Sequence, residues 1–327
     1  MTRSNGQERV PPAVEVPEVR PYVSLQYRAA PPPRRPGSLL LAVVLFVLTV
    51  GSTVVAGTEF ALAYTSIRAP FMADSGTFAA ILSDPGVLLL GVPFSFTLLG
   101  ILLAHELGHF FACRYYGIAA SFPYFIPAPT IIGTMGAFIR IRSPIVNRKA
   151  LFDVGLAGPV VGFLFAVPAL AIALAHSKVV PAAQVDSTII FGHPLLERLL
   201  TAVFHPGVPM ESVFLHPVGR AAWVGLFATA LNLIPIGQLD GGHILYALAS
   251  EKHRRVSLAF VLLLVPLGLK FWAGWLFWSA LLMFLGFRHP PLINRWEPID
   301  GQRRVWGAIA LVIFLLCFMP APFVLLE

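Results

Sequence analysis

The sequence predicts an all-α polytopic membrane protein, with about seven transmembrane helices and one re-entrant segment like a β-hairpin. The first observation is composition: 57% of the 327 residues are hydrophobic and 12% are charged, about half the charged fraction of soluble domains. The second is a series of apolar runs about twenty residues long. The third is a group of ionisable residues inside one of these runs. This composition excludes a soluble globular protein, and the 27 Gly and 29 Pro follow no collagen-like period.

The amino-terminal segment differs from the rest of the chain. Residues 1–37 are rich in proline and mixed charges and hold no long apolar run, so we expect a flexible cytoplasmic tail. Residues 38–327 are expected to form the transmembrane domain, because about twenty helical residues cross roughly 30 Å of hydrocarbon. Its predicted parts are a core at about 87–250, with spans at 87–116, 151–175 and 219–238, and accessory spans at 38–60, 256–286 and 305–325.

Basic residues between the spans predict the orientation. Lys270 divides 256–286 into two stretches that are each short for a crossing, so we expect a hairpin of two spans there. With seven spans and a cytoplasmic amino terminus, more than half of the 23 Lys and Arg flank the cytoplasmic side, as the positive-inside rule requires. The net charge of +7 therefore predicts contact with the lipid bilayer and not with nucleic acid. The expected location is a bacterial cell (inner) membrane.

The ionisable group lies in the span 87–116 and has the sequence HELGH. On a helix, His105 and His109 share one face, where two imidazoles can bind one cation and Glu106 can reach a water bound to it. This spacing is the HExxH pattern of zinc hydrolases. The alternative is a solvated polar face, which a position within lipid disfavours because burying these groups unpaired costs several kcal/mol.

A catalytic zinc site needs a third protein ligand, and Asp240 is the best candidate. It closes the span 219–238 in the run LNLIPIGQLDGGH, where proline and glycines break the helix. That span and the HELGH span are expected to run in the same direction, so their ends lie at one depth. On spacing alone, Asp240 is equally a ligand or a turn residue before Gly-Gly. His243 is a less favoured alternative ligand, because it lies beyond the bend.

Three motifs together resemble the site-2 protease family of intramembrane zinc metalloproteases. They are HELGH, the run GLAGPVVG at 155–162, and NLIPIGQLDGGH, which ends like the family's Leu-Asp-Gly-Gly branch. The resemblance covers about residues 90–250, the predicted protease core. It implies one Zn²⁺ per chain bound by His105, His109 and Asp240, with Glu106 as the general base. It also implies transmembrane protein substrates and regulated intramembrane proteolysis.

Two neighbouring segments are expected to support this chemistry. Gly155, Gly158 and Gly162 form a small-residue stripe that predicts tight packing of the third span against the second, holding the metal ligands in place. The alternative is generic helix packing. Asn232 either helps to stabilise an oxyanion or a ligand, or bonds to a neighbouring helix.

Residues 122–143 are rich in proline, glycine, aromatic and β-branched residues and alternate near their end, which favours a re-entrant hairpin over a helix. A peptide bond within a helix is shielded, so a substrate has to unwind, and its freed backbone groups could pair with this segment. Gly133 and Gly136 are candidate substrate contacts. The alternative is an ordinary interfacial loop.

The functional hypothesis is an intramembrane zinc endopeptidase that hydrolyses peptide bonds in or next to transmembrane helices. One alternative is a multi-pass metal-ion transporter, which would need a polar pathway across the bilayer. The outer half of the HELGH span, VLLLGVPFSFTLLGILLA, supplies only Ser95 and Thr97. The other alternative is a non-catalytic membrane scaffold that binds zinc for stability. The sequence assigns no oligomeric state.

Overall fold

The computed structural model describes residues 37–71, 76–181, 189–286, 289, 292–294 and 296–325. The predicted tail, 1–37, lies almost entirely outside them. Within the described residues the chain is mostly helical, as predicted, with nine α-helices and three two-stranded sheets. The helices are α1 (Gly37–Ser66), α2 (Thr77–Ser83), α3 (Val92–Tyr115), α4 (Arg148–Ala175), α5 (Leu195–Phe204), α6 (Pro217–Leu233), α7 (Asp240–Lys270), α8 (Gly274–Leu285) and α9 (Gly301–Cys317). The strands are β1 (Tyr124–Pro127), β2 (Thr134–Phe138), β3 (Lys178–Val179), β4 (Ile189–Phe191), β5 (Val213–Phe214) and β6 (Phe323–Leu325).

Three helical segments of the described chain are long and apolar enough to cross a membrane. They are Leu39–Ser66, Pro85–Tyr115 and Arg148–Ala175, and they coincide with the first three predicted spans. The second begins with a 3-10 helix, Pro85–Gly91, that leads directly into α3. The later apolar segments form shorter helices: α6 and α9 have 17 residues each and α8 has 12.

The predicted span 219–238 extends five residues beyond the carboxyl-terminal end of the corresponding helix, α6. Helix α6 stops at Leu233, because Pro235 cannot continue the hydrogen-bonding pattern and Gly237 adopts a left-handed conformation with φ of 54°. The chain then turns and starts α7 at Asp240. A second interruption lies inside α7, where Ala249 has φ of −147° and ψ of 61° and kinks the helix.

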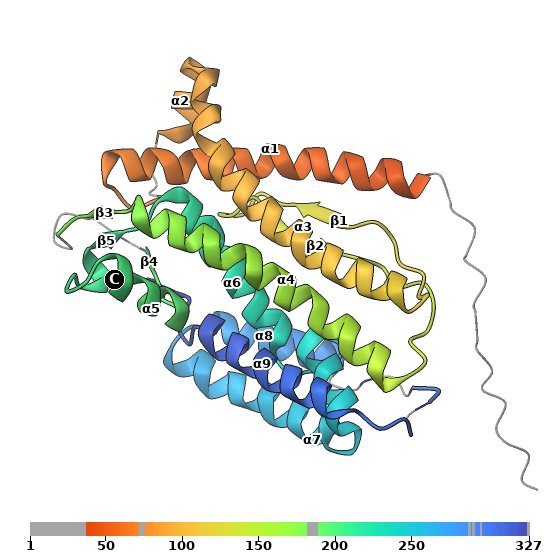
Figure 1. Cartoon of the computed structure of the whole chain (residues 1–327). Coiled ribbons are helices and arrows are strands. Elements are labelled where there is room, and N and C mark those ends of the chain that lie inside the picture. Colours follow the sequence, from red (N-terminus) through yellow and green to blue (C-terminus); the bar gives the residue numbers. More distant parts are fainter. Residues whose placement is uncertain are drawn as a thin grey trace, which may run out of the picture.

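The helices that surround the HELGH motif lie in the middle of the molecule. Figure 1 shows α1 along one side, α7 and α9 along the opposite side, and α3, α4 and α6 between them. Ile101 of α3 meets Gly225 of α6, and further along His105 meets Asn232, so α3 and α6 run in parallel. Helix α4 runs antiparallel to α3, because Gly162 faces His105 and Gly158 faces His109.

Segment 122–143 contains a β-hairpin. Strands β1 and β2 pair antiparallel, with Tyr124 opposite Phe138 and Phe125 opposite Ala137. The hairpin packs against α1 on one side, where Ser52 Oγ donates a 2.6 Å hydrogen bond to the Gly133 carbonyl. Strand β2 also approaches α3. The hairpin therefore lies between the first helix and the HELGH helix (Figure 1).

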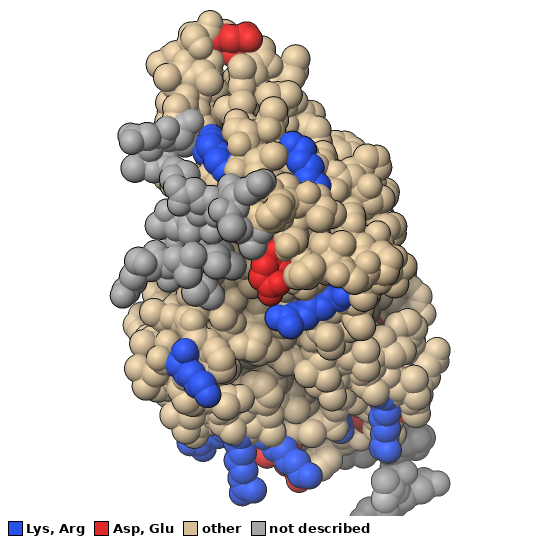
Figure 2. All heavy atoms as spheres, turned by 90° about the vertical axis from the view of Figure 1, so that its left-hand side faces the viewer, with Lys and Arg blue, Asp and Glu red and all other residues tan. Residues whose placement is uncertain are grey.

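The two ends of the helical assembly differ in their polar contacts. At the end where α3 finishes, Arg303 of α9 donates to Asp153 of α4 at 2.9 Å and to the Tyr116 hydroxyl at 3.1 Å, which ties three helices together. The backbone N–H and guanidinium of Arg303 also hold the pKa of the exposed Asp300 carboxyl below its ordinary value. Figure 2 shows the opposite end of the molecule, where acidic and basic side chains lie spaced among uncharged residues.

A buried carboxylate anchors the segment that follows α1. Glu59 is 4% exposed and accepts hydrogen bonds from the Arg68 guanidinium at 2.8 Å, the Phe71 N–H at 2.8 Å and the Thr77 hydroxyl.

We expect Glu59→Leu to lower the free energy of unfolding by about 3 kcal/mol, because it removes the acceptor that these three donors share. Thermal unfolding in detergent measures the change. The exposed Thr65→Val, on the same helix, should shift stability by less than about 0.5 kcal/mol; equal midpoints for both variants would contradict this expectation.

Candidate metal centre

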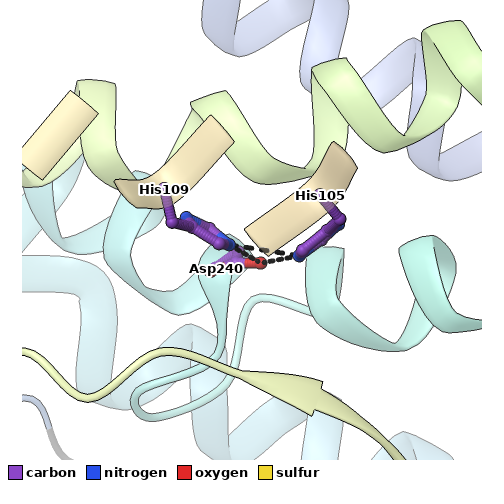
Figure 3. Close-up of side chains that lie close together, drawn as sticks. All are labelled: His105, His109 and Asp240. Carbon is purple, nitrogen blue, oxygen red and sulfur yellow. Dashed lines mark hydrogen bonds and ion pairs between the residues drawn. The ribbon is translucent and has the colours of Figure 1, made fainter. Parts of the chain in front are cut away.

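Two imidazoles and one carboxylate converge at the centre of the molecule. His105 and His109 lie one turn apart on α3 and are 5% and 8% exposed, and their Nε2 atoms are 3.1 Å apart. Asp240 Oδ2 lies 3.4 Å from His105 Nε2 and 3.3 Å from His109 Nε2. Figure 3 shows all three side chains pointing at one another. Among the described residues, these three form the one group of His, Cys, Asp and Glu with ligand atoms close enough to share a metal ion.

The triangle of ligand atoms has the dimensions of a zinc site. A tetrahedral Zn²⁺ with bonds of about 2.05 Å separates its ligand atoms by about 3.3 Å, and the three edges here are 3.1, 3.3 and 3.4 Å. Two imidazoles and one carboxylate also leave a fourth position open, as in catalytic zinc sites. The residues present therefore fit a catalytic zinc ion.

A hydrogen bond to the backbone orients the His109 imidazole, and an amide of α6 lies beside His105. His109 Nδ1 lies 2.7 Å from the Val154 carbonyl oxygen, and since a carbonyl only accepts, Nδ1 carries the proton. The Nε2 lone pair of His109 then points at the other two ligand atoms, the arrangement that metal-binding histidines use. Asn232 on α6 places its side-chain nitrogen 3.2 Å from His105 Nε2, so the amide borders the metal group directly.

The turn between α6 and α7 brings Asp240 to the histidines. Its carboxylate is 14% exposed and belongs to the first residue of α7, so Asp240 begins a helix and does not close one as the sequence predicted. A side chain at Gly241 or Gly242 would overlap backbone atoms of Leu233 or Gly237, so both positions need glycine for the turn to close. The alternative ligand, His243, points elsewhere: its Nδ1 is 2.9 Å from His289 Nε2.

Glu106 lies beside the metal group and faces two cavities. Its side chain is buried, and the backbone N–H of Ile139, just after β2, donates to its carboxylate. The larger cavity has a volume of about 520 Å³ and the smaller about 240 Å³, and both are lined by His105, Glu106, Ala137 and Asn232. The smaller one also reaches the other two metal-group residues, His109 and Asp240. Glu106 and the three candidate ligands thus border the same open space.

The glycine stripe of α4 packs against the metal group, as its spacing predicted. A methyl group at Gly158 would overlap the His109 ring, and one at Gly162 would lie 3.1 Å from His105 Nδ1. At Gly155 the same atom would lie 3.1 Å from the Asp240 carbonyl oxygen. Gly158 and Gly162 therefore lie against the imidazoles of two candidate ligands, whereas Gly155 lies against the first turn of α7, where the nearest atom to a Cβ would be His243 Cβ at 2.8 Å.

Comparison with known proteins agrees with this geometry. The model of peptidase family M50, the site-2 protease family, matches residues 93–271, more than half of the chain. The chain belongs to peptidase family M50. Its similarity extends beyond the matched core: the probable zinc metalloprotease EGY1, chloroplastic, of Arabidopsis thaliana is 33% identical over 297 residues, covering 86% of this chain. The probable zinc metalloprotease EGY2, chloroplastic, of the same plant is 30% identical over 245 residues, or 71% of this chain. The chain spans 53% of the length of EGY1 and 42% of the length of EGY2.

The predicted site residues of this M50 protein fall into two sets. The structure brings together His105, His109, Asp240, Glu106 and Asn232, and Gly136 lines the larger cavity with open space around its Cα. Gly133 does not reach the site. It packs against α1, where a Cβ would lie 2.5 Å from the Ser52 carbonyl oxygen.

Sequence reasoning missed the groups that support the site through the backbone. The Val154 carbonyl and the Ile139 N–H contribute no side chain, so no residue type reveals them. The sequence features that could have pointed to these two backbone groups lie beside them. Val154 precedes the glycine stripe, and Ile139 lies in the alternating end of segment 122–143. The aromatic walls of the larger cavity were missed as well, because they come from α6, the α7–α8 connection, α8 and the carboxyl-terminal strand.

Proposed function

We propose that the protein is an intramembrane zinc metalloendopeptidase that hydrolyses peptide bonds in or next to transmembrane helices of other membrane proteins. The observation that carries the proposal is the triangle of His105, His109 and Asp240 with edges of 3.1 to 3.4 Å and Glu106 beside it. Membership of family M50 and the names of the relatives, probable zinc metalloproteases, support the same activity and the same metal.

In this proposal the chain's own residues divide the work of peptide hydrolysis. His105, His109 and Asp240 hold Zn²⁺, which when bound polarises the scissile carbonyl and lowers the pKa of water. Glu106 takes the proton of the attacking water and delivers it to the leaving amine. Asn232 donates an amide hydrogen to the carbonyl oxygen as negative charge develops there. The buried position of Glu106 strengthens these interactions, because charges interact more strongly away from bulk water.

The hairpin offers a place for an unwound substrate. Strand β2 pairs with β1 on one edge, and in the described part of the chain its other edge has no strand partner. Residues Thr134–Ala137 of β2 line the larger cavity beside Glu106. We infer that a substrate segment adds to this edge as an extended strand, with Gly136 allowing its backbone to approach closely. Gly133 supports the hairpin by its contact with α1.

The finer architecture is also part of the proposal. The apolar segments of α1, α3, α4, α6, α7, α8 and α9 would supply seven spans, with 256–286 forming two of them and the amino terminus in the cytoplasm of a bacterial cell (inner) membrane. The tail would be 1–37 and the protease core about 87–250. The three helices that are long and apolar enough to span support the membrane location. The smaller cavity, which extends toward His109 and Asp240, would admit water from the cytoplasmic side.

Zinc analysis of single variants tests the ligand set. We expect His105→Ala and Asp240→Ala to lose zinc affinity by more than about a hundredfold, because even the loss of a group that only orients a ligand costs about 10- to 100-fold. Both should also stop cleavage of co-expressed single-span reporter proteins. His243→Ala is the matched control and should retain zinc, since its ring hydrogen-bonds to His289. If purified Asp240→Ala holds as much zinc as the wild type, Asp240 is not a ligand.

A further inference from the structure

We propose that the 520 Å³ cavity binds a large apolar side chain of the substrate, carried by the residue that flanks the cleaved bond on its membrane side. The inference rests on the proposed peptidase function and specifies its substrate class. His105 and Glu106 form one end of this cavity. A peptide bond placed beside Glu106 therefore brings a neighbouring side chain to the mouth of the cavity.

The position of the cavity decides which neighbour it receives. Ile101 lines it one turn before His105 on α3, and Ala228 lines it one turn before Asn232 on α6. Because α3 and α6 are parallel, the cavity extends from the metal group toward the amino-terminal ends of both helices. His105 lies ten residues before the end of α3 at Tyr115, or about 15 Å of helix, so this direction leads further into the span. The smaller cavity extends the opposite way, toward His109, Gln238 and Asp240.

The lining selects apolar groups. Its walls are aromatic and aliphatic, with Trp223, Phe227, Trp272, Trp278 and Phe323 contributing rings. The threonine hydroxyls in the lining already donate to carbonyl oxygens: Thr134 to Ile126 at 2.9 Å and Thr229 to Gly225 at 2.9 Å. Away from the end formed by His105, Glu106 and Asn232, a charged side chain inserted here would lose its hydration without gaining partners. An apolar cavity on the order of 150 Å³ already accepts a benzene ring, so this one has room for the largest aromatic side chains.

Two variants change the cavity in opposite directions. Ala228→Leu narrows it, and Trp278→Ala widens it from α8. Phe277→Ala is the matched control for the second variant, because Phe277 is the adjacent residue of α8, is 64% exposed and does not line the cavity. Zinc content and unfolding midpoint, measured for all three, establish that the variants fold.

The experiment uses one single-span reporter protein that the wild type cleaves, with the cut mapped by mass spectrometry. The residue on the membrane side of the cut is then changed to Ala, Leu, Phe or Asp. We expect the wild type to cleave the Phe and Leu reporters with kcat/KM at least about tenfold above those of Ala and Asp. Ala228→Leu should reduce the Phe-to-Ala ratio by about tenfold, Trp278→Ala should raise the Phe-to-Leu ratio, and Phe277→Ala should leave both ratios unchanged.

A binding readout that needs no turnover covers the case in which Ala228→Leu misfolds. With Glu106→Gln to prevent cleavage, Ala228→Cys should form a disulfide with a reporter that carries cysteine at the same membrane-side residue when a mild oxidant is added. Phe277→Cys should not. Equal kcat/KM for all four reporters in the wild type, or unchanged ratios in both cavity variants, would overturn the inference. Failure of the wild type to cleave any reporter would instead overturn the proposed function, and the inference with it.

Discussion

Glu106→Gln should reduce the rate of reporter cleavage by at least about a hundredfold, and by as much as about 10⁴-fold, while zinc content remains at the wild-type level. Glutamine has the size and shape of glutamate but cannot accept a proton at neutral pH. Glu106 is buried beside the ligand triangle but is not one of its three members, so the exchange leaves the metal group intact. Zinc analysis and a time course of reporter cleavage on the same preparation provide the measurement.

Measured beside the wild type, this variant also separates the peptidase from both alternatives. A metal-ion transporter would keep its three ligands in Glu106→Gln and would keep its flux, measured as zinc uptake into proteoliposomes. A zinc-binding scaffold would show no cleavage in the wild type and an unfolding midpoint that falls on chelation. Retention of full cleavage by Glu106→Gln would exclude Glu106 as the general base and would require another proton acceptor in the two cavities.

The two histidines of the candidate metal centre could be predicted because their spacing is fixed by local geometry, whereas spacing alone left Asp240 equally a ligand or a turn residue. His105 and His109 share a face wherever the HELGH segment is helical, and burial in lipid leaves these groups few alternatives to a shared cation. The fit of the glycine stripe of α4 followed from its spacing of three and four residues. The predicted first three spans also match the structure, since their runs of apolar residues are long enough for the signal to be unambiguous.

The parts that were not predicted depend on contacts between segments that are distant in sequence. The end of α6 at Leu233 and the start of α7 at Asp240 were not resolved by hydropathy, because the apolar run continues through Ile234 and Ile236 after the helix has stopped. The cavity walls combine α3, the hairpin, α6, α8 and β6, so no local pattern could reveal them. The packing of Gly133 against α1 is likewise a tertiary contact between residues about eighty positions apart.

Gly158→Ala should lower zinc affinity by at least about tenfold, because the added methyl group would overlap the His109 ring and displace it from the ligand triangle. Two effects oppose each other in this substitution. Replacing glycine by alanine inside a helix favours folding by about 0.5–1 kcal/mol, whereas overpacking a tight contact costs about 1–3 kcal/mol. The overlap is with a ring that is attached to α3 and is also fixed to α4 by the hydrogen bond to the Val154 carbonyl, so the steric effect should dominate.

Gly100→Ala is the matched control, since it adds the same methyl group to α3 at a position with no atom within 4 Å. It should keep wild-type zinc affinity and unfold at the same or a slightly higher temperature. Gly162→Ala should fall between the two, because its methyl group would lie 3.1 Å from His105 Nδ1, a contact that a small shift relieves. Zinc titration of the three purified variants, with unfolding midpoints in detergent, measures this order. Equal zinc affinity in Gly158→Ala and Gly100→Ala would mean that His109 can move without loss of the metal, and that α4 does not set the ligand geometry.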